Sequence, residues 1–172
     1  DHGAQYFTAR DPAFRDEVER WQRQGVAALW QPRLKVFDLS GAQDNNECVE
    51  RFVGLPRMTA PARLLANGLP LQTGLTAVAL HRQANGWHLD TAEKGRLEGL
   101  FDGVILALPA PQAVPLLVPV SPLLAADARR GRMAGCWALM LRFGAALDLS
   151  FDAAFVNHGP LRWVARDGSK PG

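Results

Sequence analysis

The side chains best suited to chemistry in this sequence lie in two short stretches, one near either end of the printed residues. The later stretch combines an aromatic ring with charged groups beside an expected turn: Trp163, Arg166, Asp167 and Lys170. In the earlier stretch, Gly3 and Ala4 stand just before Tyr6, and small residues allow close approach of a backbone or a flat ligand. Both patterns indicate binding groups. The commoner explanation of the later stretch is an edge strand with a turn, and that of the earlier stretch is a strand following a turn.

No familiar catalytic motif accompanies these stretches. A Walker loop, GxSxG, HExxH, a CxxC pair and GxGxxG are all absent from the sequence. The histidines are isolated, and isolated histidines are more often surface or hydrogen-bonded residues than ligands: His2, His81, His88 and His158. Cys48 and Cys136 lack metal-ligand spacing, so we expect no metal site and two buried free thiols in a reducing cytoplasm.

Composition narrows the class of protein. With 48% hydrophobic and 21% charged residues, the chain can build a real core and does not resemble a disordered protein. A net charge of +2 with scattered arginines gives no argument for nucleic acid. No apolar run reaches membrane-spanning length and no leader pattern is present. We therefore expect a cytoplasmic protein that acts on a small molecule, without a nucleic-acid or membrane partner.

The element expected to organise the rest is the stretch FDGVILALPAPQA at Phe101–Ala113. Val104–Leu108 is apolar without a break, which favours a strand covered on both faces. Pro109 would end this strand, and Pro111 would lie in the first turn of a following helix. Open α/β sheets bind ligands where a buried strand turns into a helix. An ordinary core strand without a ligand explains the pattern about equally well.

Other elements follow from local signals. Asp11 and a proline predict a helix start, Val18 and Trp21 share its apolar stripe, and Gly25 ends it. The dipeptide Asn85-Gly86 predicts a hairpin within an antiparallel meander. Further strands are expected at Val26–Gln31, Leu34–Leu39, Cys48–Val53, Ala154–Asn157 and Leu161–Arg166, a polar loop at Ser40–Glu47, and helices starting at Thr59 and at Ser121-Pro122.

Alternation of apolar residues predicts one more strand, Trp137–Phe143. Trp137, Leu139, Leu141 and Phe143 would share a buried face, so Leu139→Ala or Leu141→Ala should cost about 2–5 kcal/mol. The predicted fold class is α+β, derived from α/β: a mixed sheet, an antiparallel meander over Leu71–Phe101 and one buried strand.

Four segments, in the right order along the chain, resemble bacterial flavin-containing amine-oxidase-like proteins of the renalase group. They are DHGAQYFTARDPAFR at Asp1–Arg15, LQTGLTAVALHRQANGWHL at Leu71–Leu89, FDGVILALPAPQA at Phe101–Ala113 and PLRWVARDGSKPG at Pro160–Gly172. The third alone would be weak, since many flavoproteins with two dinucleotide folds carry something like it. The resemblance implies an FAD-dependent oxidoreductase that oxidises a small substrate by hydride transfer to the flavin.

The resemblance also implies roles for individual residues. Four residues would lie beside the isoalloxazine ring: Gly3, Ala4, Gln5 and Tyr6. Ala77 would meet the adenine, while Leu108, Pro109 and Ala110 would approach the ribose and pyrophosphate. Tyr6 and Trp163 would border the substrate. No catalytic residue is implied.

In such proteins a GxGxxG unit precedes the first segment and a flavin segment follows the last, so we expect this chain to be a central fragment. Residues 1–9 and 70–115 would belong to the FAD-binding domain, and residues 10–69 and 116–172 to the substrate-binding region. We expect the fragment alone to be inactive, to hold FAD weakly, and to cover its exposed central strand by forming a homodimer. A non-catalytic ligand-binding or protein-interaction domain of the same architecture stays open as the alternative.

Overall fold

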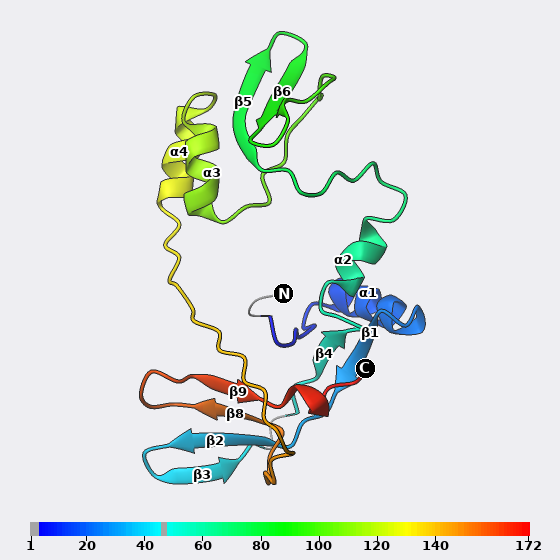
Figure 1. Ribbon diagram of the computed structural model, residues 1–172, viewed down its shortest axis with the longest axis vertical. Helices are drawn as coiled ribbons and strands as arrows, with labels where there is room; N and C mark the ends of the chain where they lie inside the picture. Colours follow the sequence, from blue (N-terminus) through cyan, green and yellow to red (C-terminus); the bar gives the residue numbers. More distant parts are fainter. Residues whose placement is uncertain (1–3, 46–47) are drawn as a thin grey trace. The chain divides into compact units, whose positions relative to one another are not determined.

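The computed structural model describes residues 4–45 and 48–172 of the chain. It contains helices and several small sheets, so the coarse prediction of an α+β fold is confirmed (Figure 1). The residues group into two compact units. Unit 1 comprises Asp1–Leu69 and Ala138–Gly172, and unit 2 comprises Pro70–Trp137.

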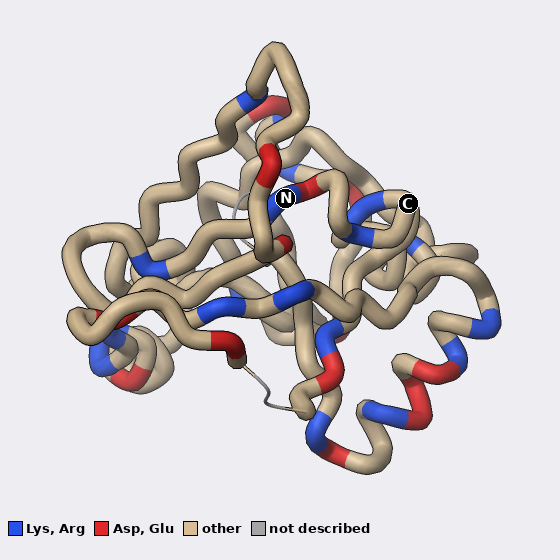
Figure 2. The backbone as a smooth tube through the Cα atoms, turned by 90° about the horizontal axis from the view of Figure 1, so that it is seen from below, with Lys and Arg blue, Asp and Glu red and all other residues tan. Residues whose placement is uncertain are grey.

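Helix α1 (Pro12–Arg23) of unit 1 forms where the sequence predicts it. The Asp11 carboxylate accepts a hydrogen bond from the Phe14 N–H at 3.0 Å, which satisfies one of the free donors of the first turn. Val18 and Trp21 are buried on the inner face. Gly25, with φ of 71°, takes the left-handed conformation that ends the helix. Both basic and acidic residues occur along α1, and Figure 2 colours the two kinds along the backbone.

Strands β1 (Ala27–Trp30) and β4 (Arg51–Gly54) form an antiparallel ribbon with a different core on each face. On one face the ribbon packs against α1 through a cluster of buried residues: Ala9, Val18, Trp21, Ala27 and Phe52. On the other face lies a second cluster: Trp30, Leu34, Val53 and Ala153. Neighbouring strand residues point to opposite faces of the ribbon. Phe52 therefore lies on the face of the first cluster, while Arg51, which pairs with Trp30, lies on the face of the second. Short helix α2 (Ala60–Leu65) follows β4.

A mixed four-stranded sheet completes unit 1, in the order β3-β2-β8-β9. Its strands are β2 (Leu34–Asp38), β3 (Gly41–Asp44), β8 (Ala153–Val156) and β9 (Trp163–Ala165), followed by a short 3₁₀ helix at Asp167–Ser169. Strands β2 and β8 pair in parallel and the other pairs are antiparallel. The polar loop expected at Ser40–Glu47 was wrong over Gly41–Asp44, because β3 pairs there as an exposed edge strand after a two-residue turn at Leu39-Ser40. Residues 46–47 of that loop lie outside the described residues.

Unit 2 contains the predicted meander, with β5 (Ala77–Gln83), β6 (Gly86–Thr91) and β7 (Gly95–Arg96). The hairpin predicted from Asn85-Gly86 is confirmed, since Gln83 pairs with Gly86 across the turn. Phe101 adds an isolated antiparallel bridge to Trp87. Helices α3 (Ala110–Leu117) and α4 (Pro122–Arg129) also belong to this unit, with buried residues at Ala113, Leu116 and Ala125. None of the helices in the described residues is long and apolar enough to cross a membrane.

The buried strand expected at Val104–Leu108 does not form. Beyond the Phe101 bridge the backbone is irregular, and Ile105 is 94% exposed. An apolar run becomes a buried strand only where neighbouring strands take up its backbone groups and other layers cover both its faces. In the described part of unit 2 the strands of the meander pair only with one another, so Val104–Leu108 has no neighbouring strand to form hydrogen bonds with. The helix predicted to follow is present, because α3 begins at Ala110.

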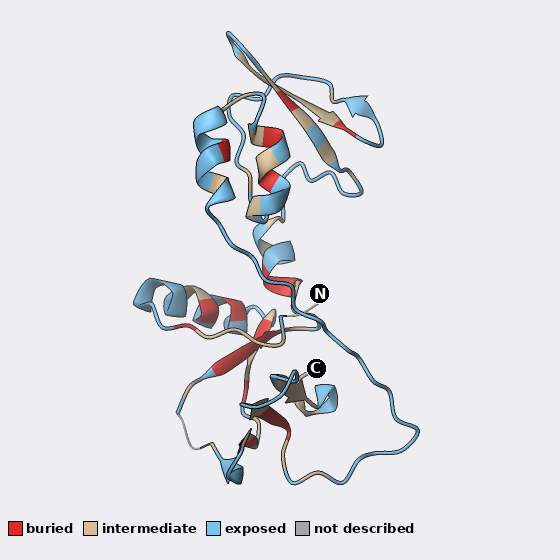
Figure 3. Ribbon diagram, turned by 90° about the vertical axis from the view of Figure 1, so that its left-hand side faces the viewer, coloured by how far each residue is buried: buried red, intermediate tan, exposed pale blue. Residues whose placement is uncertain are grey.

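The strand expected at Trp137–Phe143 is also absent. This stretch is irregular and open to solvent, and Trp137 is fully exposed. Most of the long segment after α4 is pale blue in Figure 3 for this reason. Cys48 and Cys136 lie in irregular segments too and are exposed free thiols, so their expected burial was wrong. Self-association through such exposed apolar stretches stays a prediction.

The division into units does not follow the expected division into flavin and substrate regions. Both divisions have a boundary next to Pro70, but residues 1–9 fall in unit 1 with the rest of the N-terminal half. Residues 116–137 fall in unit 2. The functional assignment of these ranges stays a prediction.

Candidate functional site

Aromatic side chains from three distant parts of the sequence meet in unit 1. The Tyr6 ring lies 6.0 Å from that of Trp30 and 5.4 Å from that of Trp163, measured between ring centroids. Trp163 also lies 4.7 Å from Phe155. Trp30 is buried, whereas Tyr6, Phe155 and Trp163 are half-buried. We call Tyr6, Trp30, Phe155 and Trp163 the aromatic cluster.

The backbone explains why these rings converge. Phe7 forms an isolated bridge with Phe52 of β4, through N–H···O hydrogen bonds of 2.9 and 2.8 Å. Because adjacent residues of an extended chain point in opposite directions, Phe7 enters the core under α1 while Tyr6 enters the aromatic cluster. Trp163 reaches the same place because β9 pairs with β8, where it lies opposite Phe155.

Two cations border the aromatic cluster. The Lys170 ammonium donates to Gln5 Oε1 at 2.9 Å and to Asp167 Oδ1 at 3.0 Å, and its nitrogen lies 5.7 Å from the Trp30 ring centroid. The Arg51 guanidinium carbon lies 5.5 Å from the Tyr6 ring centroid. A cation within about 6 Å of an aromatic face is attracted by the ring quadrupole. The cluster is therefore an aromatic surface with a positive margin.

Arg51 differs from the other described arginines of unit 1 in its burial. Only 6% of its surface is exposed, yet among the described residues it forms no ion pair. Its Nη1 donates to the Val49 carbonyl at 2.9 Å, while its Nε is sealed from solvent without any partner. Trp163 Nε1 is buried without a partner as well. Such groups are uncommon in native structures, because an unpaired buried donor costs free energy.

Asp152 fixes the strands that carry this surface. Its carboxylate accepts hydrogen bonds from the Arg33 backbone N–H at 3.0 Å, from the Arg33 guanidinium at 2.9 and 3.0 Å, and from Arg166. The side-chain hydrogen bond from Arg33 is the main reason why the pKa of Asp152 falls from 3.8 to about 2. Both guanidiniums are held by this one carboxylate, so Asp152 serves as a structural clamp between β2, β8 and β9.

The residues predicted as site residues have different outcomes. Gln5, Tyr6 and Trp163 meet at the aromatic cluster, with Ala4 exposed beside them. Gly3 lies outside the described residues. The other predicted cofactor residues belong to unit 2, where Ala77 begins β5 and Ala110 begins α3, preceded by the exposed residues Leu108 and Pro109.

Sequence reasoning missed Trp30 and Arg51. Both lie in segments correctly assigned to strands, and the register that places them opposite each other was not considered. Pairing the predicted strand that contains Trp30 with the one that contains Phe52 would have revealed the role of Arg51. A shift of this pairing by one residue decides whether Arg51 or Phe52 faces the cluster.

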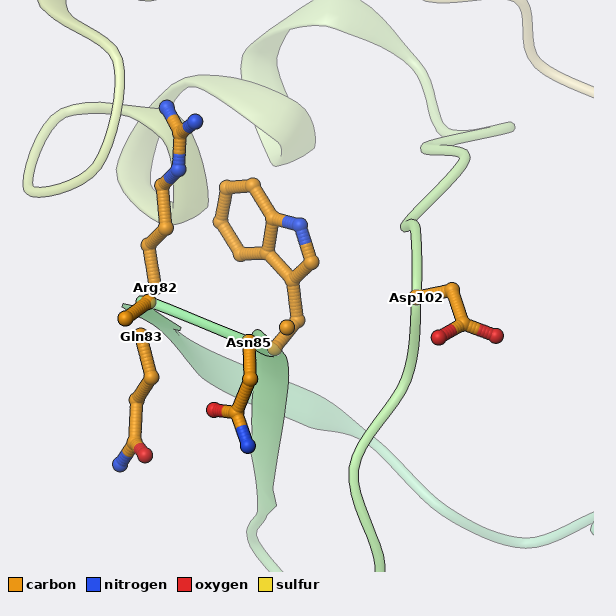
Figure 4. A pocket seen from close by; sticks show the side chains of 7 residues that line it. Arg82, Gln83, Asn85 and Asp102 are labelled. Carbon is orange, nitrogen blue, oxygen red and sulfur yellow. The ribbon is translucent and has the colours of Figure 1, made fainter.

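Unit 2 contains a shallow, open and polar depression at the tip of the β5–β6 hairpin. It is lined by the turn residues Arg82–Trp87 and by Asp102 (Figure 4). The Arg82 guanidinium lies 5.8 Å from the Trp87 ring centroid along one side. These are solvated turn groups around a wide opening, so the depression offers little burial to a ligand.

In the described part of the chain, no three His, Cys, Asp or Glu side chains gather in a way that could hold a metal ion. No protein-family model matches the sequence. The aromatic cluster with Arg51, Lys170 and Gln5 is therefore the candidate functional site. Its groups are suited to holding a flat ligand and a negative charge.

Proposed function

We propose that this chain supplies the substrate-binding region of an FAD-dependent oxidoreductase of the amine-oxidase-like, renalase-like type, which oxidises a small molecule. The observation that carries the proposal is the convergence of Gln5, Tyr6 and Trp163. The family resemblance implies ligand-contacting roles for these three residues, although 157 positions, the difference between 163 and 6, separate Tyr6 from Trp163.

The residues of the candidate site suit one end of an FAD molecule. A partly exposed aromatic surface with the Gln5 amide and the Lys170 ammonium beside it fits the edge of a flat heterocycle. A pyrophosphate is usually held at a helix N-terminus reached through a glycine-rich turn, and GxGxxG is absent from these residues. FAD would supply the hydride acceptor, while Tyr6 and Trp163 would orient the substrate and exclude water.

A non-catalytic binding domain is the second candidate. The specific observation in its favour is that the described residues of the candidate site include no histidine or cysteine, and that the carboxylate bonded to Lys170, that of Asp167, is exposed. General acid–base catalysis usually requires such a group within hydrogen-bond reach of the substrate. Hydride transfer to a flavin demands less of the protein, so the oxidoreductase remains the leading proposal.

The test compares the 172-residue chain with the longest open reading frame that contains it. We expect the longer polypeptide to be yellow after purification and the 172-residue chain to be colourless. In the longer polypeptide, Tyr6→Ala should shift the flavin spectrum or slow flavin reduction. Phe37→Ala is the control, because Phe37 packs on Phe151 and is not part of the aromatic cluster.

A longer polypeptide that neither purifies with flavin nor binds added FAD would overturn the oxidoreductase proposal in favour of the binding domain. Wild-type spectra and reduction rates in Tyr6→Ala would remove Tyr6 from the site. Micromolar or tighter FAD binding by a monomeric 172-residue chain would contradict the argument from the missing glycine-rich turn.

A further inference from the structure

Arg51 is the feature of unit 1 that the protein's own contacts explain least. A guanidinium is always charged, and burying it without an anionic partner is costly. Other cations of this unit have carboxylate partners: the exposed Arg33 and Arg166 share Asp152, and the half-buried Lys170 bonds Asp167. Arg51 has one backbone carbonyl, that of Val49, and one aromatic ring, that of Tyr6.

Two described carboxylates of unit 1 close to this region of the fold, those of Glu50 and Asp152, are already engaged. Glu50, which directly precedes β4, forms an ion pair with Arg15 of α1. Glu47 lies outside the described residues. Asp152 is saturated by two arginines. Among the described residues, no carboxylate pairs with the positive charge of Arg51 at the edge of the aromatic cluster.

We propose that Arg51, assisted by Lys170, is an anion-binding subsite, and that it takes a small carboxylate carried on a flat or aromatic body. The carboxylate would accept hydrogen bonds from the guanidinium, whose planar fork matches its geometry. The flat body would lie against the half-buried rings of Tyr6 and Trp163. A carboxylate oxygen would also give the buried Trp163 N–H an acceptor if that ring turned toward it.

This inference stands without a flavin. If the proposed oxidoreductase function also holds, the subsite would fix the anionic group of the substrate, and substrates would be carboxylates. Flavin content and anion binding are measured separately, so one proposal can fail while the other survives.

The test uses the 172-residue chain, labelled with ¹⁵N, and benzoate as the probe. The chain has five tryptophans, whose indole N–H signals are assigned with single Trp→Phe variants. At constant ionic strength, benzoate should shift the Trp30 and Trp163 signals in a saturable way. Benzamide has the same ring without the charge and should bind about tenfold or more weakly, because hydrogen bonds to charged partners are the stronger ones.

Variants then identify which positive side chain binds the carboxylate of benzoate. Arg51→Gln should weaken benzoate binding about tenfold or more, and Lys170→Met should weaken it less. Arg20→Gln is the matched control, because it removes one exposed positive charge from α1, on the other face of the ribbon, and should leave binding unchanged. Arg51→Lys keeps the charge and loses the fork, so its affinity should fall between those of wild type and Arg51→Gln.

Equal binding of benzoate and benzamide by the wild-type chain would overturn the proposal, and this comparison needs no variant to fold. A folded Arg51→Gln chain that binds benzoate normally would do the same. Inorganic phosphate binding as tightly as benzoate would overturn the role given to the aromatic rings. The absence of any saturable shift with benzoate would remove the subsite altogether.

Discussion

Trp30 and Trp137 lie in two regions that both contain large apolar side chains and differ in what surrounds them. Trp30 is 2% exposed, its strand pairs with β4, and its indole N–H donates to the Ser169 carbonyl at 3.1 Å. Trp137 begins an irregular, exposed stretch that includes Leu139 and Leu141. Apolar side chains alone did not bury either region. The backbone partner made the difference, because a strand without a ladder leaves its polar groups to water.

The largest expected effect is that of removing Trp30. Trp30→Ala deletes a buried ring between Tyr6 and the β1–β4 ribbon, so it should lower the free energy of unfolding by about 3–5 kcal/mol. Trp137→Ala is the matched control and should change it by less than about 0.5 kcal/mol. Urea unfolding followed by circular dichroism measures both. Equal losses would show that Trp137 is buried in solution and would end the comparison.

A smaller effect is expected at the clamp. Asp152→Asn removes the charge shared by Arg33 and Arg166 and should cost about 1.5–3 kcal/mol. The pKa of Asp152 is lowered from 3.8 to about 2 on folding, so its stabilising contribution is present above about pH 4 and is lost as the pH falls towards 2. Urea unfolding at a series of pH values should show this loss in wild type. An Asp152→Asn chain with an unchanged acid profile would contradict the assignment.

In unit 2 two glycines allow a similar comparison between a paired strand and an irregular stretch. A Cβ added at Gly86, where φ is 150°, would come within 2.7 Å of the Phe101 carbonyl oxygen, so Gly86→Ala should cost about 1–3 kcal/mol. Gly103→Ala meets nothing within 4 Å and should be close to neutral. Amide hydrogen exchange of β5 and β6 reports the local effect. A neutral Gly86→Ala would mean that the Phe101 bridge is not formed in solution.

The smallest effect is expected where alternation predicted a core. Leu139→Ala and Leu141→Ala should each change the free energy of unfolding by less than about 0.5 kcal/mol, because both side chains are exposed. The same urea experiment measures them, with Trp30→Ala as the positive control. A cost of 2 kcal/mol or more would support the buried strand that the sequence predicted and would contradict the exposed position of these side chains.

Local signals predicted the parts of the fold that are determined locally. The Asp11 cap, the apolar stripe of α1 and the Asn85-Gly86 turn each act within a few residues, and each element is present. The runs at Val104–Leu108 and Trp137–Phe143 were misjudged because a strand depends on partners that a sequence pattern does not contain.

The candidate site was predicted only in part, because it too depends on strand partners that a local sequence pattern does not contain. Tyr6 and Trp163 were singled out by their residue types and surroundings, and the family resemblance added Gln5. Arg51 could not be recognised from its own neighbourhood, since its importance depends on a register with Trp30 and on its burial without an ion pair to any described residue. The parallel pairing of β2 with β8, about 119 residues apart, is equally invisible to a local pattern.

The discontinuous make-up of unit 1 has a consequence for folding during synthesis. Unit 2 is one uninterrupted segment, Pro70–Trp137, so it can fold as soon as it leaves the ribosome. Strand β2 leaves earlier but must wait for β8, and Tyr6 must wait for Trp163, until residues 153–163 have been made. Throughout that interval Tyr6 and Trp30 have each other as ring partners but lack Trp163 and Phe155. The candidate site is therefore completed only after all of unit 2 has been made.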